Sequence, residues 1–172
     1  KEWIVYSPGV VTSLNLAIMS FTKPGDSIII QSPVYSPFFS VVKNNNRTLS
    51  LNPLIEESGY YTIDFENLEK QMASGCKIMI LCSPHNPVGR VWTRTELNKI
   101  AKLCEKYEVL MVSDEIHSDL ILPGYKHIPT ATATEYIKQN SVTCIAPSKT
   151  FNLPGLTISA VIIPNPKLRI EF

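Results

Sequence analysis

Apolar residues along the chain fall into short continuous runs that alternate with longer segments of helical period. The short runs are rich in β-branched residues and are bounded by turn signals such as Lys23-Pro-Gly-Asp26, so they predict strands. We expect strands at residues 27–31, 47–51, 77–82, 109–113, 141–145 and 157–163, and the opening residues 1–6 are strand-like.

The longer segments have the period of amphipathic helices. In residues 9–21 the apolar positions recur at helical spacing, and Ser7-Pro8 is expected to cap this helix and begin its first turn. Residues 64–72 and 93–106 are also predicted helices, and the second begins with a capping box, Thr93 followed by Glu96. The chain opens on a strand-like run and stops inside a segment of helical character, so we expect it to be a piece of a longer protein.

The alternation of these elements predicts an α/β fold. Continuous apolar strands such as Ile78-Met-Ile-Leu81, separated by helices, are typical of a mostly parallel sheet covered on both faces, an α/β/α sandwich. No internal repeat, low-complexity tract or linker divides the chain. In such sheets ligands bind beyond the carboxyl ends of the strands, so the residues that follow each strand are the candidate site.

Five strand exits carry polar, aromatic or glycine-containing sets. They are Ser7-Pro-Gly-Val-Val11, Ser32-Pro-Val-Tyr35, Ser83-Pro-His-Asn-Pro-Val-Gly-Arg90, Asp114-Glu-Ile-His117 and Ala146-Pro-Ser-Lys149. Taken singly, each has an ordinary structural explanation. Asp114 and Glu115 fit a helix cap beside a solvated carboxylate, and Asn86 fits a turn. Tyr35 fits a core or interface aromatic, and Lys149 fits a surface amine.

Composition narrows the function classes. The 172 residues carry a formal charge of +1 without a block of like charge, so we expect neither a nucleic acid nor a membrane partner. Four cysteines without C-x-x-C spacing, and no signal peptide or long apolar span, predict a reduced cytoplasmic protein. No G-x-G-x-x-G motif marks a dinucleotide site. Cys82 and His85 have metal-like spacing, but no second pair completes a site, so no metal is expected.

The order of these segments resembles the large domain of fold-type I enzymes that use pyridoxal 5′-phosphate (PLP), the aspartate aminotransferase superfamily of classes I and II. Within that superfamily, Ser83-Pro-His-Asn-Pro-Val-Gly-Arg-Val-Trp92 and Ser113-Asp-Glu-Ile-His-Ser-Asp-Leu120 resemble the C–S lyase branch, the MalY/PatB-type cystathionine β-lyases. The resemblance covers nearly the whole chain. It implies that residues 1–172 are the central part of the PLP-binding large domain and that the small domain is absent from this chain.

The resemblance also implies roles for individual residues. Lys149 is the catalytic lysine, which forms a Schiff base with the cofactor aldehyde and later removes the substrate Cα proton. Asp114 pairs with the pyridinium nitrogen and keeps it protonated. Asn86 donates to the phenolic oxygen of the cofactor, and His117 touches the same oxygen or stands behind it. Tyr35 stacks on the ring.

The phosphate of PLP has its own predicted partners. The amides of Gly9, Val10 and Val11 at a helix N-terminus hold it through unpaired N–H groups and the helix dipole. The position three residues before the lysine is often a Ser or Thr that contacts the phosphate, but here it is Ala146. Ser148 is expected to supply a hydroxyl instead. The arginine that binds the substrate carboxylate in this superfamily lies outside these residues. The intact protein is expected to be a homodimer that takes a small amino-acid substrate, and residues 1–172 alone are expected to have little activity.

Three functions remain open on the sequence. The resemblance favours a PLP-dependent C–S β-lyase that cleaves cystathionine or a related cysteine S-conjugate to a thiol, pyruvate and ammonia. A PLP-dependent aminotransferase of the same fold is the first alternative, because the two reactions share their early steps. The second is a non-catalytic aminotransferase-like domain with a regulatory or sensing role. The presence of Lys149, Asp114 and Asn86 together argues against a dead site.

Overall fold

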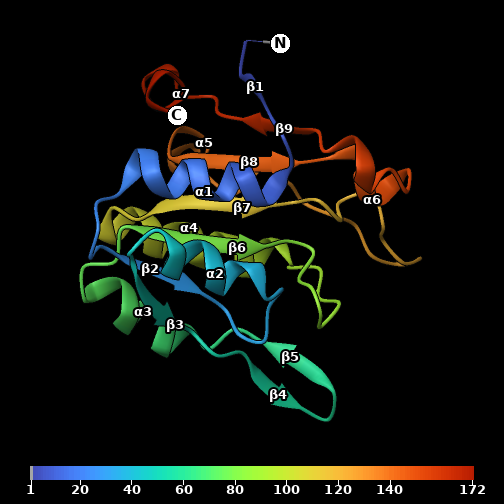
Figure 1. Ribbon diagram of the computed structural model, residues 1–172. Helices are drawn as coiled ribbons and strands as arrows, with labels where there is room; N and C mark the ends of the chain where they lie inside the picture. The colour runs from blue at the N-terminus through green and yellow to red at the C-terminus, as the bar shows by residue number, and fades with distance from the viewer. Residues whose placement is uncertain (1) are drawn as a thin grey trace.

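The computed structural model describes residues 2–172, which form a central sheet of seven strands (Figure 1). In spatial order the strands are β1 (Ile4–Ser7), β9 (Ser159–Ile162), β8 (Ser141–Ile145), β7 (Leu110–Asp114), β6 (Ile78–Cys82), β2 (Ser27–Ile30) and β3 (Thr48–Leu51). Strand β9 runs antiparallel to both neighbours, and the other adjacent pairs are parallel. The predicted mostly parallel sheet is confirmed.

Helices cover both faces of this sheet (Figure 1). One face packs against α1 (Val10–Phe21), α2 (Pro37–Asn44) and α7 (Pro166–Glu171), and the other against α3 (Phe65–Ala73), α4 (Arg94–Tyr107) and α5 (Glu135–Gln139). Alternate strand residues divide between the two cores: Ile28 and Ile30 join the α1–α2 side, and Ile29 joins the α3–α4 side. Because both faces are buried, the strands are apolar throughout, and the α/β/α sandwich is confirmed.

Smaller elements complete the fold at the carboxyl edge. Strands β4 (Ile55–Glu57) and β5 (Tyr60–Thr62) form a separate antiparallel hairpin after β3. The short helix α6 (Pro147–Thr150) directly follows β8, and 3₁₀ turns lie at Thr130–Thr132 and Pro154–Leu156. Figure 1 shows α6 beyond the arrowhead of β8, at the edge toward which β6, β7 and β8 all point.

Most predicted elements have a counterpart whose ends lie within two residues of the expected ones, apart from the first strand. The capping box of α4 is confirmed, because the Thr93 hydroxyl accepts from the Glu96 amide and the Glu96 carboxylate accepts from the Thr93 amide. The predicted Ser7-Pro8 cap of α1 is wrong. Ser7 ends β1, and Gly9 occupies the cap position without a side-chain hydrogen bond.

The parallel arrangement brings four strand exits to one edge, those of β2, β6, β7 and β8. Strand β1 is antiparallel to β9, which is antiparallel to β8, so β1 ends at this edge as well. The predicted site residues therefore converge there. No helix among residues 2–172 is both long and apolar enough to span a bilayer.

Candidate active site

The nine predicted site residues line one cavity of about 270 Å³ at the carboxyl edge of the sheet. They are Gly9, Val10, Val11, Tyr35, Asn86, Asp114, His117, Ser148 and Lys149. A larger cavity of about 500 Å³ adjoins it and shares Asn86 and His117, but Asp114 and Lys149 do not line it. Of these two cavities, only the smaller one is lined by both Asp114 and Lys149.

The amino end of α1 contributes unpaired amides to this cavity. Gly9 has a φ of 92°, a backbone conformation that favours glycine, and it turns the chain from β1 into the helix. The Gly9 amide donates to the Ser7 carbonyl at 2.9 Å, whereas among residues 2–172 the amides of Val10, Val11 and Thr12 have no hydrogen-bond acceptor. Thr12, which sequence reasoning missed, also lines the cavity. Unpaired amides at a helix N-terminus favour an anion.

Asp114 lies at the carboxyl end of β7 and is only 5% exposed. Burial raises the pKa of its carboxyl group to about 6, although the hydrogen bond from the Ile116 amide at 3.1 Å opposes this rise. The Glu115 carboxylate raises the pKa further, and the Lys149 cation lowers it. Such a carboxylate is stabilised by a cationic ligand in the cavity.

The alternative explanation of Asp114 and Glu115 as a cap beside a solvated carboxylate is wrong, because both side chains are buried. Glu115 accepts hydrogen bonds from the Ser113 hydroxyl at 3.0 Å and the Thr130 amide at 2.8 Å. Its second oxygen lies 2.8 Å from Nε2 of His127. These contacts hold Glu115 away from the cavity and leave Asp114 as the acid that lines it.

Asn86 and Tyr35 come from neighbouring strand exits that are joined through the backbone. The Tyr35 amide donates to the Asn86 carbonyl at 3.1 Å, and the Asn86 amide donates to the Cys82 sulfur at 3.4 Å. His85 Nε2 lies 2.9 Å from the Pro33 carbonyl. Cys82 and His85 thus have separate partners, and residues 2–172 contain no cluster of three or more side chains suited to a metal ion.

The remaining three site residues follow β7 and β8. Lys149 and Ser148 lie on α6, where Lys149 is exposed. The Thr150 hydroxyl donates to the Asp119 carboxylate at 2.8 Å and ties α6 to the segment after β7. Burial and the Lys149 cation lower the pKa of His117, which favours a neutral imidazole at pH 7.

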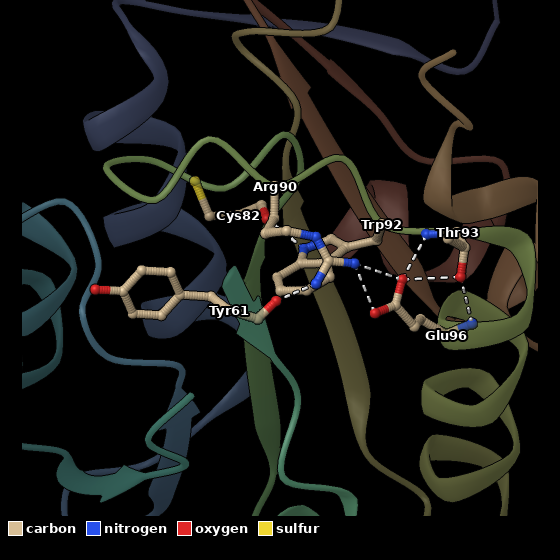
Figure 2. Close-up of polar contacts among 6 residues, drawn as sticks. All are labelled: Tyr61, Cys82, Arg90, Trp92, Thr93 and Glu96. Carbon is tan, nitrogen blue, oxygen red and sulfur yellow. Dashed lines mark hydrogen bonds and ion pairs between the residues drawn. The ribbon is translucent and has the colours of Figure 1, made fainter. Parts of the chain in front are cut away.

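A buried arginine anchors the loop that carries Asn86 (Figure 2). Arg90 donates to both carboxylate oxygens of Glu96, at 2.8 and 3.0 Å, and to the carbonyl of Tyr61. Its guanidinium carbon lies 4.5 Å from the ring centroid of Tyr60 and 4.7 Å from that of Trp92. The Arg90 carbonyl accepts from the His85 amide at 2.8 Å, which closes the loop around Asn86. Arg90 therefore joins this loop to α4 and to the β4–β5 hairpin.

We expect Arg90→Ala to lower the free energy of unfolding by about 2–4 kcal/mol, because it leaves the half-buried Glu96 carboxylate without its cationic partner and the Tyr61 carbonyl without a donor. Urea denaturation of the purified protein measures the change. Lys106→Ala is the matched control, since the Lys106–Glu69 pair is exposed and its loss is expected to have no measurable effect. Equal stability of the two variants would show that Arg90 does not anchor the loop.

Comparison with known proteins places the chain in a family. Residues 1–170 match the family described as "Aminotransferase class I and II". The chain belongs to this family. Among curated relatives, it is 51% identical to cystathionine beta-lyase PatB of Bacillus subtilis over 172 residues, 99% of this chain and 44% of PatB. It is 35% identical to protein MalY of Escherichia coli over 98% of this chain and 43% of MalY.

Solved structures of the family agree with these relatives. The crystal structure of cystalysin from Treponema denticola, which contains a PLP cofactor, superposes with a TM-score of 0.97 at 47% identity, over 99% of this chain and 43% of cystalysin. The predicted resemblance to the MalY/PatB branch is confirmed. The chain spans under half the length of each of these proteins.

Proposed function

We propose that the intact protein is a PLP-dependent C–S β-lyase that cleaves cystathionine or a related cysteine S-conjugate. The observation that carries this proposal is that Lys149, Asp114 and Asn86 line one cavity together with the residues of α1 that have unpaired amides. The similarity to cystathionine beta-lyase PatB supports the choice of substrate class.

The donor set of this cavity fits PLP. The amides of Val10, Val11 and Thr12 suit a phosphate, and the buried Asp114 carboxylate suits a protonated ring nitrogen. The amine of Lys149 suits an aldehyde, and the Asn86 side chain can donate to a ring oxygen. The volume of this cavity, about 270 Å³, is slightly below the range common for small-molecule sites, roughly 300–1,000 Å³.

Each of these residues then has a defined task. PLP, when bound, accepts the electron pair that remains on the substrate Cα after deprotonation. Lys149 would hold the cofactor through its amine, and the same amine would take the proton from the substrate Cα. Asp114 keeps the ring nitrogen protonated, which is needed for the ring to accept that electron pair. Tyr35, which is 45% exposed and lines the cavity, would stack on the cofactor ring, and the amides of α1 would hold the phosphate.

The net reaction consumes water. A cysteine S-conjugate and one water give a thiol, pyruvate and ammonium: the Cβ–S bond breaks, and the amino group leaves by hydrolysis. The test is to give cystathionine to the full-length protein with PLP and to measure thiol, pyruvate and ammonia. We expect the three products in equal amounts, and residues 1–172 alone are expected to produce little of any. Absence of pyruvate and thiol from the PLP-loaded full-length protein would refute the lyase.

An aminotransferase is the second candidate, because the family that matches residues 1–170 takes its name from that activity. In that case the same incubation with a keto acid would yield a new amino acid without release of thiol. A protein that forms no covalent adduct with PLP at all would instead support a regulatory or sensing role.

We further propose that residues 1–172 form the central part of a PLP-binding large domain, with the small domain elsewhere in the protein. All four cysteines are free and buried, which supports a reducing, cytoplasmic location. Exposed apolar side chains near the cavity, including Phe151 and Leu156, support a homodimer. Analytical ultracentrifugation of the full-length protein tests the dimer, and a monomer at micromolar concentration would contradict it.

A further inference from the structure

Three buried serines from different elements meet behind the turn that leads into α1. Ser7 ends β1, Ser13 lies on α1 and Ser159 begins β9. Their exposed fractions are 5%, 0% and 0%. Because 146 residues separate Ser13 from Ser159, only the tertiary fold brings them together.

The hydroxyl groups of two of these serines hold the backbone of this turn. Ser159 Oγ donates to the Ser7 carbonyl at 3.0 Å, and the same carbonyl accepts from the Gly9 amide at 2.9 Å. Ser13 Oγ lies 3.0 Å from Ser159 Oγ and 3.2 Å from the Gly9 carbonyl. The turn is thus contacted from β9 and from the helix that it precedes.

Counting protons limits how these contacts can be made. Ser13 and Ser159 have one hydroxyl proton each, but they share three contacts, so one contact lacks a proton at any moment. Unless both protons point into the gap between the two hydroxyl oxygens, at least one of them is donated to the carbonyl of Ser7 or Gly9. Every favourable arrangement therefore ties the turn to the buried hydroxyl pair.

We propose that Ser159 and Ser13 are positioning residues for the anion-binding amides of α1, and hence for the phosphate of PLP; this rests on the proposed function. The Gly9 cap has no side-chain hydrogen bond of its own. Its φ of 92° is a conformation that favours glycine, and the glycine backbone has more conformational freedom than that of other residues. The hydroxyl pair restricts that freedom and keeps the amides of Val10, Val11 and Thr12 directed at the cavity.

The test compares the affinity of the full-length apo-protein for PLP with its affinity for pyridoxal, which lacks the phosphate. We expect Ser159→Ala to weaken PLP binding about 3- to 10-fold, the effect of one lost hydrogen bond, and to leave pyridoxal binding unchanged. Ser13→Ala is expected to act in the same direction and serves as the second variant if Ser159→Ala folds poorly. A general loss of structure would lower both affinities together.

Ser141→Ala is the matched control. Ser141 is also a fully buried strand serine, but its hydroxyl has no partner among residues 2–172. It is the first residue of β8 and so lies at the end of that strand away from the cavity. It is expected to change neither affinity. An unchanged ratio of PLP to pyridoxal affinity in both Ser159→Ala and Ser13→Ala would overturn the positioning role while the proposed function stood. A wild-type protein that does not bind PLP would refute the proposed function, and the positioning role with it.

Discussion

Lys149→Ala is expected to abolish the covalent adduct between the protein and PLP and all activity that depends on it, while the domain stays folded. The variant removes the amine that can condense with the aldehyde in this cavity. The side chain is exposed on a short helix and no residue of α6 is buried, so its loss removes little packing. Borohydride reduction followed by peptide mapping detects the adduct, and circular dichroism reports the fold.

Lys138→Ala is the control for this experiment. Lys138 is a half-buried lysine on α5, with a side chain that is 41% exposed; α5 precedes β8 and so lies at the other edge of the sheet from Lys149. The reduced adduct is expected on Lys149 in this control as in the wild type. A reduced adduct on another lysine in Lys149→Ala, or unfolding of that variant, would mean that the site is wrongly assigned.

Asp114→Asn is expected to have opposite effects on activity and on the stability of the apo-protein. Loss of a fixed electrostatic partner of a developing charge commonly costs about 10²–10³-fold in rate, and we expect a loss of that size in the PLP-loaded protein. In the apo-protein, the buried carboxylate lacks a cationic ligand. Its replacement by a neutral amide is therefore expected to raise the free energy of unfolding at neutral pH.

The sign and the pH range of the stability effect follow from the pKa of Asp114, which rises from 3.8 in the unfolded chain to about 6 in the fold. The native state binds the proton more tightly, so this carboxyl group costs nothing below pH 3.8 and lowers stability as the pH rises toward 6. The full cost above pH 6 is about 3 kcal/mol, from about 1.4 kcal/mol for each pH unit.

Urea denaturation of the two apo-proteins between pH 4 and pH 8 measures this difference. The free energy of unfolding of Asp114→Asn minus that of the wild type should grow between pH 4 and pH 6 and then remain level. Asp26→Asn is the control, because Asp26 lies in the turn before β2 at the opposite edge of the sheet. A difference that does not change with pH would contradict the proposed state of Asp114.

Asp114 and Arg90 are two buried charged residues near the carboxyl edge of the sheet, and they affect stability in opposite directions. Asp114 is a buried anion that the fold tolerates at a cost in stability, as is common for groups held ready for a ligand. Arg90 is a buried cation whose partners are all supplied by the chain, so it stabilises the loop that carries Asn86. Buried charge at this edge thus lowers stability in the case of Asp114 and stabilises a loop in the case of Arg90.

The order of strands and helices, and the convergence of the strand exits, could be predicted from the sequence. Continuous apolar runs such as Ile78-Met-Ile-Leu81 mark buried parallel strands, because such strands are covered on both faces. In parallel sheets the carboxyl ends meet at one edge, so polar residues after successive strands must lie near one another. The motifs around Asn86, Asp114 and Lys149 then indicated the family, which the comparisons confirm. Short elements such as α2 and the β4–β5 hairpin were missed, because neither was long enough to show a distinct period.

Contacts between residues far apart in the sequence were decided only by the tertiary structure. The sequence determined that Asp114 and Glu115 follow a buried strand, but only the packing of Thr130 and His127 against Glu115 left Asp114 as the acid of the cavity. Likewise, the sequence determined a helix after Gly9, while its expected cap was wrong and its first amides proved unpaired. Local patterns record which face of an element is apolar, whereas side-chain partners depend on which elements the fold brings together. The contact between Ser13 and Ser159 belongs to the second kind, since β9 reaches the turn before α1 only when the sheet is complete.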